Sequence, residues 1–229
     1  MPRTIIISGS NGNLGQEVVN ILSGEDHKII ALVGPGDIPD SFKKKTLEQT
    51  LVDLSNESAT DFLIQKMIKE YPELDAAVLL AGGFEMGSME ATNENLLDQQ
   101  ITLNFKTAWF VIKPLLSYFK KKGKGQFILI SARPAISPNE AKTKVAYAIS
   151  KSMLLALAEI INAEGRESGI TASVIIPSIL DTPQNRDSMP DADPQRWVKT
   201  SHIAKTISFI LSDTGKVLRQ PVFKLYHHS

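Results

Sequence analysis

The sequence has 229 residues, 42% of them hydrophobic, which is enough for one large α/β domain with a substantial core. Lys and Arg total 25, and Asp and Glu also total 25, so no global charge favours nucleic acid or an anionic membrane surface. Cysteine is absent, which excludes disulfides, thiolate nucleophiles and cysteine-ligated metal sites. We therefore expect a single domain over residues 1–229, a small-molecule substrate, and neither a metal nor a nucleic-acid partner.

The first apolar run, residues 5–7, is too short for the hydrophobic region of a signal peptide. Other apolar runs fall short of the length that crosses a bilayer. The lack of cysteine fits a reducing compartment. The sequence thus predicts a cytoplasmic protein without a membrane partner.

Short β-branched runs alternate with amphipathic stretches of helical length along the chain. The strands are expected at 4–8, 28–33, 75–80, 126–131 and 170–176, with a last edge strand within 216–226. The helices are expected at 14–22, 57–70, 93–122, 142–164 and 194–211. This order predicts a Rossmann-type, doubly wound parallel sheet of about seven strands with helices on both faces. The segment at about 181–198, rich in proline and acidic residues, is expected to form a substrate lid or loop.

A glycine-rich loop joins the first expected strand to the first expected helix. Glycines spaced three apart allow a tight turn and a close approach of backbone amides to a pyrophosphate, although a purely structural turn is the alternative. The helix N-terminus adds unpaired N–H groups and a positive dipole end. The candidate cofactor-binding residues are Gly9, Ser10, Asn11, Gly12, Asn13, Leu14 and Gly15.

The end of the second strand leaves the choice between NAD and NADP open. An acidic residue there would select NAD by binding the ribose hydroxyls, but the sequence reads Val33-Gly34-Pro35-Gly36. Ser10, Asn11 or the lysines at 43–45 are alternatives for that edge of the ligand. Asp53, followed by Leu54, is placed to meet the adenine amino group, with a cap at the start of a helix as the alternative.

Tyr147 and Lys151 lie four residues apart and so on one face of an expected helix. A cation near a phenol favours its ionised form and lowers a pKa that starts near ~10. The pair therefore suits proton exchange with a substrate near neutral pH. The spacing also fits a half-buried ring beside a solvated amine, so other motifs must decide between the two interpretations.

Several motifs occur in an order that resembles the short-chain dehydrogenase/reductase family over the whole chain. They are the glycines at 9, 12 and 15, Asp53, the segment Ala81-Gly82-Gly83, Asn104, the Tyr147/Lys151 pair and Pro177-Ser178. The segment 180–193, followed by Trp197, is most similar to the dihydropteridine reductase-like subgroup. The resemblance implies NAD or NADP as the cofactor and a homodimer or homotetramer formed through the helices of Asn104 and Tyr147.

The resemblance also implies a role for each matching residue. Tyr147 is expected to donate a proton as hydride reaches the substrate. Lys151 is expected to lower the pKa of Tyr147 and to bind the nicotinamide ribose. Asn104 is expected to hold a water of the proton relay, unless its amide serves only a neighbouring turn. The remaining cofactor contacts implied are Ala81, Gly82 and Gly83 near the adenosine, and Pro177, Ser178, Ile179 and Thr182 near the nicotinamide. A helix cap is the alternative for Thr182.

The chain departs from the family pattern after the fifth strand, where a catalytic serine is common and Ala132 stands instead. Ser131 lies one residue earlier, and a shift of one residue along a strand reverses the direction of a side chain. Ser137 lies in a turn between two prolines. Loss of such a donor typically costs about 2.7 to 4 kcal/mol for an oxyanion, so its absence favours an acceptor that spreads charge over a ring. The dihydropteridine reductase-like subgroup resembles this chain here, with Ala in place of Ser.

The leading hypothesis is hydride transfer from the nicotinamide to a pterin-like, quinonoid or carbonyl acceptor. The substrate-side candidates are Phe84, Arg133 and Trp197. One alternative is a carbonyl or alcohol dehydrogenase that uses Ser131 as a catalytic residue. The other is a dinucleotide-binding sensor without catalysis, against which the retained Tyr147 and Lys151 argue.

Overall fold

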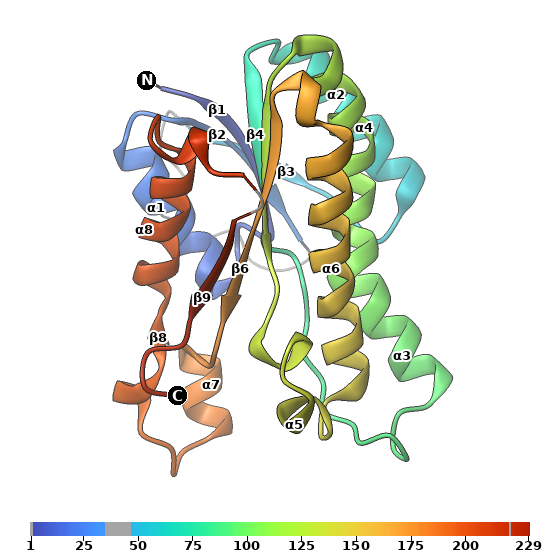
Figure 1. The fold of residues 1–229 in the computed structure, drawn as a ribbon, viewed down its shortest axis with the longest axis vertical. Coiled ribbons are helices and arrows are strands. Elements are labelled where there is room, and N and C mark those ends of the chain that lie inside the picture. Colours follow the sequence, from blue (N-terminus) through green and yellow to red (C-terminus); the bar gives the residue numbers. More distant parts are fainter. Residues whose placement is uncertain (1, 35–46, 220) are drawn as a thin grey trace.

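Seven parallel strands form one sheet in the order β3-β2-β1-β4-β5-β6-β9, which confirms the predicted Rossmann-type fold (Figure 1). The computed structural model describes residues 2–34, 47–219 and 221–229, so Pro35, Gly36 and the lysines at 43–45 lie outside the described residues. The strands are β1 (Thr4–Ser8), β2 (Lys28–Val33), β3 (Leu47–Leu51), β4 (Leu74–Leu79), β5 (Gly125–Ile130), β6 (Ile170–Pro177) and β9 (Val222–Leu225).

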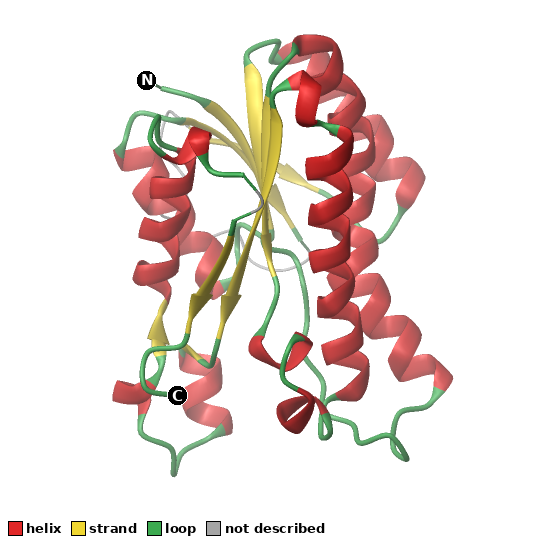
Figure 2. Cartoon of the chain, viewed as in Figure 1, coloured by secondary structure: helices red, strands yellow, loops and turns green. Residues whose placement is uncertain are grey.

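Helices cover both faces of the sheet (Figure 2). The helices are α1 (Asn13–Gly24), α2 (Glu57–Glu70), α3 (Glu94–Ile101), α4 (Thr107–Lys122), α5 (Pro138–Ala141), α6 (Val145–Glu164), α7 (Pro183–Ser188) and α8 (Thr200–Leu211). Alternate residues of β1 point to opposite faces: Ile6 packs with α2, α4 and α6, whereas Ile5 and Ile7 pack with α1 and α8. Because strands such as β1 are buried on both faces, they read as continuous apolar runs.

Several segments differ from the sequence-based expectations. β3 lies outside the expected strand ranges, and the expected helix 142–164 begins at Val145. The expected helix 93–122 is divided by a π-helical turn, Thr102–Lys106, between α3 and α4. The expected helix 194–211 begins only at Thr200, because a 3₁₀ turn and a short strand, β8 (Val198–Lys199), precede it. β8 pairs with β7 (Leu180–Asp181) in a two-stranded ribbon. The loop expected at about 181–198 therefore begins and ends at this ribbon, and it contains α7. We call residues 182–197 the β7–β8 segment.

Helix α6 is long and apolar enough to cross a membrane by length and composition alone. Its inner face packs instead in the core beneath the sheet, where Leu154, Leu157 and Ile161 are buried. A core helix of a globular protein has the same composition. The helix therefore gives no reason to place this protein in a membrane.

The parallel topology gathers the predicted site residues. The carboxyl ends of parallel strands lie at one edge of the sheet, where ligands bind in folds of this type. The loops that follow β1, β4, β5 and β6 at this edge carry the glycine-rich motif, Ala81-Gly82-Gly83, Ser131 and Ser178.

Candidate active site

The glycine-rich loop needs glycine because its backbone approaches other backbone closely. Gly9 has a φ of +62°, and a Cβ there would lie 2.7 Å from the Ala81 nitrogen. A Cβ on Gly15 would lie 2.2 Å from the Gly9 carbonyl oxygen. Gly12, whose N–H donates to that same oxygen at 3.1 Å, is exposed at the start of α1 and caps the helix without a side-chain hydrogen bond. The start of α1 thus offers free backbone N–H groups to an anion, which fits a dinucleotide pyrophosphate.

Ser10 and Asn11 fasten this loop to β2. The buried Ser10 hydroxyl donates to the Leu32 carbonyl at 3.0 Å, so its side chain serves the fold. The Asn11 Oδ1 atom accepts a hydrogen bond from the Gly34 N–H at 3.3 Å, which places an amide at the end of β2. The geometry thus favours Asn11 over Ser10 for the ribose edge, and the third alternative, the lysines at 43–45, lies outside the described residues.

Ser8 was missed by the sequence-based reasoning. Its Oγ atom accepts hydrogen bonds from the Leu80 N–H at 3.1 Å and the Ala81 N–H at 3.2 Å. These bonds tie the end of β1 to the loop after β4, so the two halves of the expected cofactor groove have a fixed spacing. A serine that ends a strand gives no sequence signal for this contact, which spans 72 and 73 residues.

Asp53 is exposed, whereas Leu54 is buried in the core. The Asp53 carboxylate accepts hydrogen bonds from the N–H and hydroxyl of Ser55, and these bonds hold the pKa of Asp53 below its ordinary value. The cap of α2 is Asn56, not Asp53. Asp53 therefore presents an ionised carboxylate to solvent at the carboxyl end of β3.

Lys151 and Asn104 lie beside the backbone of Gly82, and the Tyr147 ring lies beyond Lys151. A Cβ on Gly82 would lie 2.6 Å from the Asn104 Oδ1 atom and 3.2 Å from the Lys151 Nζ atom. The Lys151 Nζ donates to the Ile130 carbonyl at 3.0 Å and lies 6.0 Å from the centre of the Tyr147 ring. Only a residue without a side chain fits at position 82 among these polar groups.

Asn104 owes its position to the π-helical turn that divides the predicted helix. The turn lets the buried Asn104 side chain reach the loop after β4, where its Oδ1 atom accepts from the Gly83 N–H at 3.1 Å. Its Nδ2 group donates to the Gln100 Oε1 atom at 3.2 Å. Single π turns within helices are frequent at functional sites.

The expected lowering of the Tyr147 pKa is wrong for this structure. Burial raises the pKa of Tyr147 to about 12, and burial also lowers the pKa of Lys151 to about 8. Desolvation penalises the charged form of each group and exceeds the attraction between them. At neutral pH the phenol therefore holds its proton, which is the state a proton donor needs.

Phe84 lies directly beside Tyr147. The two rings meet edge to face, with centres 5.0 Å apart, and Phe84 is 58% exposed. The loop that carries Phe84 is fixed to the start of α6, because Gly87 accepts a hydrogen bond from the Val145 N–H and donates one to the Thr143 carbonyl. An exposed aromatic face thus lies next to the phenol.

Ser131 does not face an open site. Its buried hydroxyl donates to the Lys151 carbonyl at 2.9 Å and so joins the end of β5 to α6. Ala132, at the position expected for a catalytic serine, is also buried. Ser137 precedes α5 without a side-chain cap bond. The structure therefore shows Ser131 in a packing contact with α6, and a catalytic role for it stays a prediction.

The loop after β6 is held by its own neighbours. Ser178 donates through its N–H to the Leu225 carbonyl and through its hydroxyl to the Tyr226 carbonyl. The Ile179 carbonyl accepts from the Val198 N–H at 2.9 Å. Pro177, the last residue of β6, is buried.

Thr182 is the N-cap of α7, because its hydroxyl oxygen accepts from the Asn185 N–H at 3.2 Å. The alternative reading of Thr182 as a helix cap is therefore correct. A hydroxyl that accepts one hydrogen bond can still donate its own proton to a carboxamide oxygen.

The two other substrate-side candidates differ in exposure. Trp197 is 4% exposed and therefore packs in the interior, which leaves almost no ring surface for a substrate. Arg133 lies after β5, pairs with Glu140 at 2.5 Å and covers the Tyr226 ring, with its guanidinium carbon 5.3 Å from the ring centre. Arg133 is thus near the sheet edge but already has protein partners.

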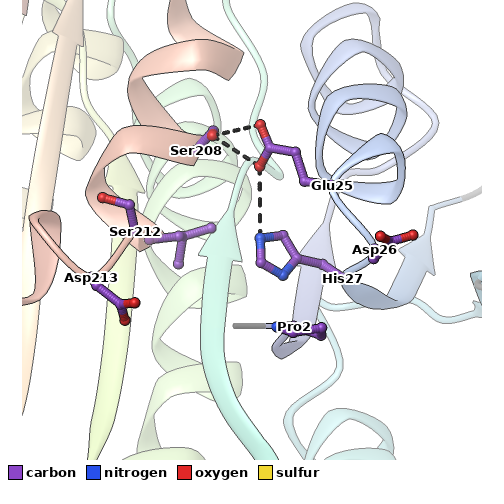
Figure 3. A pocket seen from close by; sticks show the side chains of 8 residues that line it. Pro2, Glu25, Asp26, His27, Ser208, Ser212 and Asp213 are labelled. Carbon is purple, nitrogen blue, oxygen red and sulfur yellow. Dashed lines mark hydrogen bonds and ion pairs between the residues drawn. The ribbon is translucent and has the colours of Figure 1, made fainter.

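A surface cavity of about 350 Å³ lies away from these residues, between the end of α1 and α8 (Figure 3). The Ser208 hydroxyl in its wall donates to Glu25, and Glu25 pairs with His27 at 3.7 Å. Burial lowers the pKa of His27. Because Ser208 bonds to the carboxylate and not to the imidazole, the three residues do not form an activated nucleophile. Among the residues with described positions, no three His, Asp or Glu side chains are arranged to hold a metal ion.

The sequence matches the short chain dehydrogenase family over residues 3–193. It is 26% identical to dihydropteridine reductase of Dictyostelium discoideum, over 90% of this chain and 87% of that protein. It is 23% identical to acetoacetyl-CoA reductase of Acinetobacter, over 93% of this chain and 92% of that protein.

Solved structures share the fold. The structure of ElxO with NADP bound has a TM-score of 0.89 at 19% identity, covering 98% of this chain and 97% of that one. The aldohexose dehydrogenase of Thermoplasma acidophilum in ligand-free form has a TM-score of 0.84 at 20% identity, covering 97% of this chain and 92% of that one.

Proposed function

Because this chain belongs to the short-chain dehydrogenase/reductase family and is an oxidoreductase that uses NAD or NADP, we propose that it reduces a pterin-like, quinonoid or carbonyl acceptor, with Tyr147 as the proton donor. The observation that carries the proposal is the cluster around Gly82, where Asn104 and Lys151 converge and Tyr147 lies one helical turn from Lys151. The nicotinamide, when bound, supplies the hydride.

The proposed binding of a dinucleotide depends on backbone groups that stay accessible because glycine has no side chain. Gly9 and Gly15 have no room for a Cβ, and Gly12 leaves the start of α1 exposed. These glycines would receive the pyrophosphate, and Gly82 would let the ligand approach Lys151. Asn11 would face the adenosine ribose, and Asp53 the adenine.

In the proposed reaction the Tyr147 hydroxyl donates its proton to the acceptor atom that gains electron density. The ammonium of Lys151 stabilises the phenolate left on the partly buried Tyr147. Asn104 holds the water from which the proton is restored. The high pKa of Tyr147, about 12, keeps the donor protonated before transfer.

The absence of a positioned serine supports an acceptor with delocalised charge. Ala132 is buried at the expected position, and Ser131 is bonded to the Lys151 carbonyl. Loss of the serine as one hydrogen-bond donor to a localised oxyanion costs about 2.7 to 4 kcal/mol in the transition state, whereas a ring system spreads the charge. The exposed face of Phe84 beside Tyr147 suits a flat ring.

The test is Tyr147→Phe, assayed with NADH and NADPH against quinonoid dihydropterin, quinones and simple carbonyls. Removing a general acid should lower kcat about 100-fold or more, and cofactor dissociation constants should stay within about twofold. Full turnover in this variant would refute the role of Tyr147. Binding of either cofactor without turnover of any acceptor by the wild type would favour a sensor instead.

Ser131→Ala separates the proposed mechanism from that of a serine-dependent carbonyl or alcohol dehydrogenase. Because Ser131 bonds to the backbone of α6, we expect a loss of stability of about 1 kcal/mol and little change in kcat. A 100-fold loss of kcat with an intact fold would instead establish the serine-dependent mechanism.

We also propose a homo-oligomer formed through α4 and α6. The apolar side chains of Trp109, Ile149 and Ile160 are 39%, 44% and 59% exposed on these helices. Leu154, Leu157 and Ile161 face the core instead. Light scattering of the wild type should give a dimer or tetramer, and Ile149→Glu should shift it toward the monomer. A monomeric wild type at micromolar concentration would contradict this assembly.

A further inference from the structure

Lys144 lies beside the proposed acceptor site and takes no part in the chemistry described so far. Its Nζ atom lies over the Phe84 ring, 5.9 Å from the ring centre. The centre of the same ring lies 5.0 Å from the centre of the Tyr147 ring. The exposed Phe84 ring is therefore bordered by both a phenol and an ammonium group.

The backbone on both sides of Lys144 is fixed to the loop that carries Phe84. Lys144 and Gly87 form a parallel β-bridge. The Gly87 N–H donates to the Thr143 carbonyl, and the Gly87 carbonyl accepts from the Val145 N–H, each at 2.9 Å. Because Gly87 follows Phe84 by three residues, these bonds hold the lysine and the aromatic ring at a defined spacing.

The ammonium of Lys144 is available to a ligand. Its side chain is partly buried, and within the described residues no hydrogen bond or ion pair joins its Nζ atom to another group. Glu85, next to Phe84 in the sequence, is exposed and makes no ion pair with this lysine. Glu140, four residues before Lys144, pairs with Arg133 instead. The charge of Lys144 thus has no partner of its own in the described part of the chain.

A lysine at this position does not serve the helix that follows it. Lys144 is the N-cap residue of α6, and its side chain makes no capping hydrogen bond. The first turn of α6 contains no acidic residue, and the positive end of the helix dipole disfavours a cation there. By contrast, α2 and α3 have Asn56 and Asn93 as N-caps, whose side chains accept from the backbone. Local structure therefore does not account for the positive charge.

We propose that Lys144 is a specificity-determining residue, which binds an anionic group on a flat acceptor whose ring lies against Phe84. The proposal narrows the substrate class to aromatic or quinonoid compounds that carry a carboxylate or another anionic substituent. Such a substituent accepts a charge-assisted hydrogen bond from the ammonium while the ring contacts Phe84. The reduction of this ligand rests on the proposed function, whereas its binding does not.

The test measures how a matched pair of flat quinones binds to the protein saturated with NAD⁺ or NADP⁺, so that no turnover occurs. Anthraquinone-2-carboxylate carries a negative charge at neutral pH, and anthraquinone-2-carboxamide has the same rings without that charge. The wild type should bind the carboxylate about fivefold more tightly than the amide, as expected for one partly exposed ion pair. Lys144→Met should abolish this preference and should change the dissociation constant of the amide less than about twofold.

Lys144→Arg and Lys142→Met are the matched control variants. Arginine retains the charge and should retain the preference for the carboxylate. Lys142 is exposed and lies outside the contact with Phe84, so Lys142→Met should behave as the wild type. Because Lys144 provides no cap to α6, the urea midpoint of Lys144→Met should not fall. Raising the salt concentration should weaken the preference of the wild type, because salt screens an exposed ion pair.

Steady-state kinetics then report on the reaction. Lys144→Met should raise the KM for the carboxylate about fivefold, with kcat within about twofold, because the lost contact is made equally in the ground state and the transition state. A preference that survives in Lys144→Met, or is lost equally in Lys142→Met, would overturn the role of Lys144. A wild type that binds neither quinone, or both equally, would overturn it too. Failure of the proposed function would appear as full turnover in Tyr147→Phe and would leave the binding preference unaffected.

Discussion

Two buried cations lie toward opposite edges of the same sheet, and their surroundings differ. Arg3, just before β1, is 8% exposed. Its guanidinium donates to the Asp75 carboxylate at 2.9 Å, to the Gln126 amide oxygen at 2.7 Å and to the Leu211 carbonyl at 2.8 Å. Lys151, on α6, is 7% exposed, but within the described residues it pairs with no carboxylate, and it donates to the neutral carbonyl of Ile130. In the part of the chain that the structure describes, Arg3 has an ion-pair partner and Lys151 has none.

This difference separates a structural charge from one that we propose to be functional. A buried cation with an ion-pair partner stabilises its surroundings only while both partners are present. A buried cation without a counterion costs free energy, which shows as the lowered pKa of Lys151, about 8. Proteins retain a buried cation at this cost in free energy where the cation binds a ligand or stabilises a negative charge that develops during a reaction. The comparison therefore predicts opposite effects of removing the two charges.

Arg3→Met should be the most damaging change. It leaves the Asp75 carboxylate, the Gln126 amide oxygen and two backbone carbonyls without their donor. The expected loss is about 3 to 5 kcal/mol in the free energy of unfolding, measured by urea titration at pH 7. Residual activity per folded molecule should remain.

Lys28→Met provides the control for Arg3→Met. Lys28 pairs with Glu73 at 3.5 Å, and about half of each side chain is exposed. An exposed pair contributes about 0 to 1 kcal/mol. Equal losses in the two variants would show that burial does not distinguish Arg3.

Lys151→Met should do the reverse: it should abolish turnover but stabilise the fold. The pKa of this lysine falls from 10.5 to about 8 on folding, a difference that corresponds to about 3 kcal/mol at pH 7. The unfolded chain binds more protons than the folded one between pH 8 and 10.5. Wild-type stability should therefore rise through this window, with the penalty complete below pH 8.

The difference in stability between the wild type and Lys151→Met isolates this titration from that of other groups. Urea titrations at intervals from pH 7 to 10 should show the advantage of the variant shrinking as pH rises. Tyr147, whose pKa burial raises to about 12, acts in the opposite sense, since its contribution to stability declines above pH 10. A constant difference across the window would show that Lys151 bears no desolvation penalty.

Gly82→Ala and Gly83→Ala test how closely the polar groups surround the functional cation. A Cβ at position 82 meets the Asn104 Oδ1 atom at 2.6 Å and the Lys151 Nζ atom at 3.2 Å, whereas at 83 it meets the end of the Leu103 side chain at 3.0 Å. We expect Gly82→Ala to lower kcat about tenfold, near 1.4 kcal/mol, and Gly83→Ala to lower it less than threefold. The dissociation constants of the cofactors, measured in parallel, distinguish an effect on the chemical step from an effect on cofactor binding. Equal effects would contradict the arrangement around Gly82.

The sequence was informative where structure follows from local pattern. Continuous apolar runs predicted β1, β2 and β6, and the spacing of glycines after β1 predicted the turn into α1. The spacing of Tyr147 and Lys151 correctly placed both on one helix. Each of these patterns is contained within about twenty residues, so tertiary contacts had little to alter.

Long-range contacts could not be predicted in the same way. The bonds of Arg3 to Asp75 and Gln126 span 72 and 123 residues, and the bond of Arg133 to Ser229 spans 96. The direction of the Tyr147 pKa shift was wrong because a spacing shows proximity but not burial, and burial dominates here. The burial of Trp197, a substrate-side candidate, could not be predicted for the same reason. Local pattern does not reveal the solvent exposure of a single side chain.

Asp53→Ala should have the smallest effect, because this third charge is neither buried nor bonded to a distant segment. The Asp53 carboxylate is exposed and bonds only locally, to Ser55. A contact with the adenine amino group competes with water at such a site, so the dissociation constants of NADH and NADPH should rise about two- to fivefold. Ser55→Ala, which frees the carboxylate but retains its charge, should have less effect. A 100-fold or greater loss of cofactor affinity in Asp53→Ala would show that solvent exposure does not predict how much each charged group of this protein contributes. It would also show that ligand binding buries a carboxylate which the free protein leaves in water.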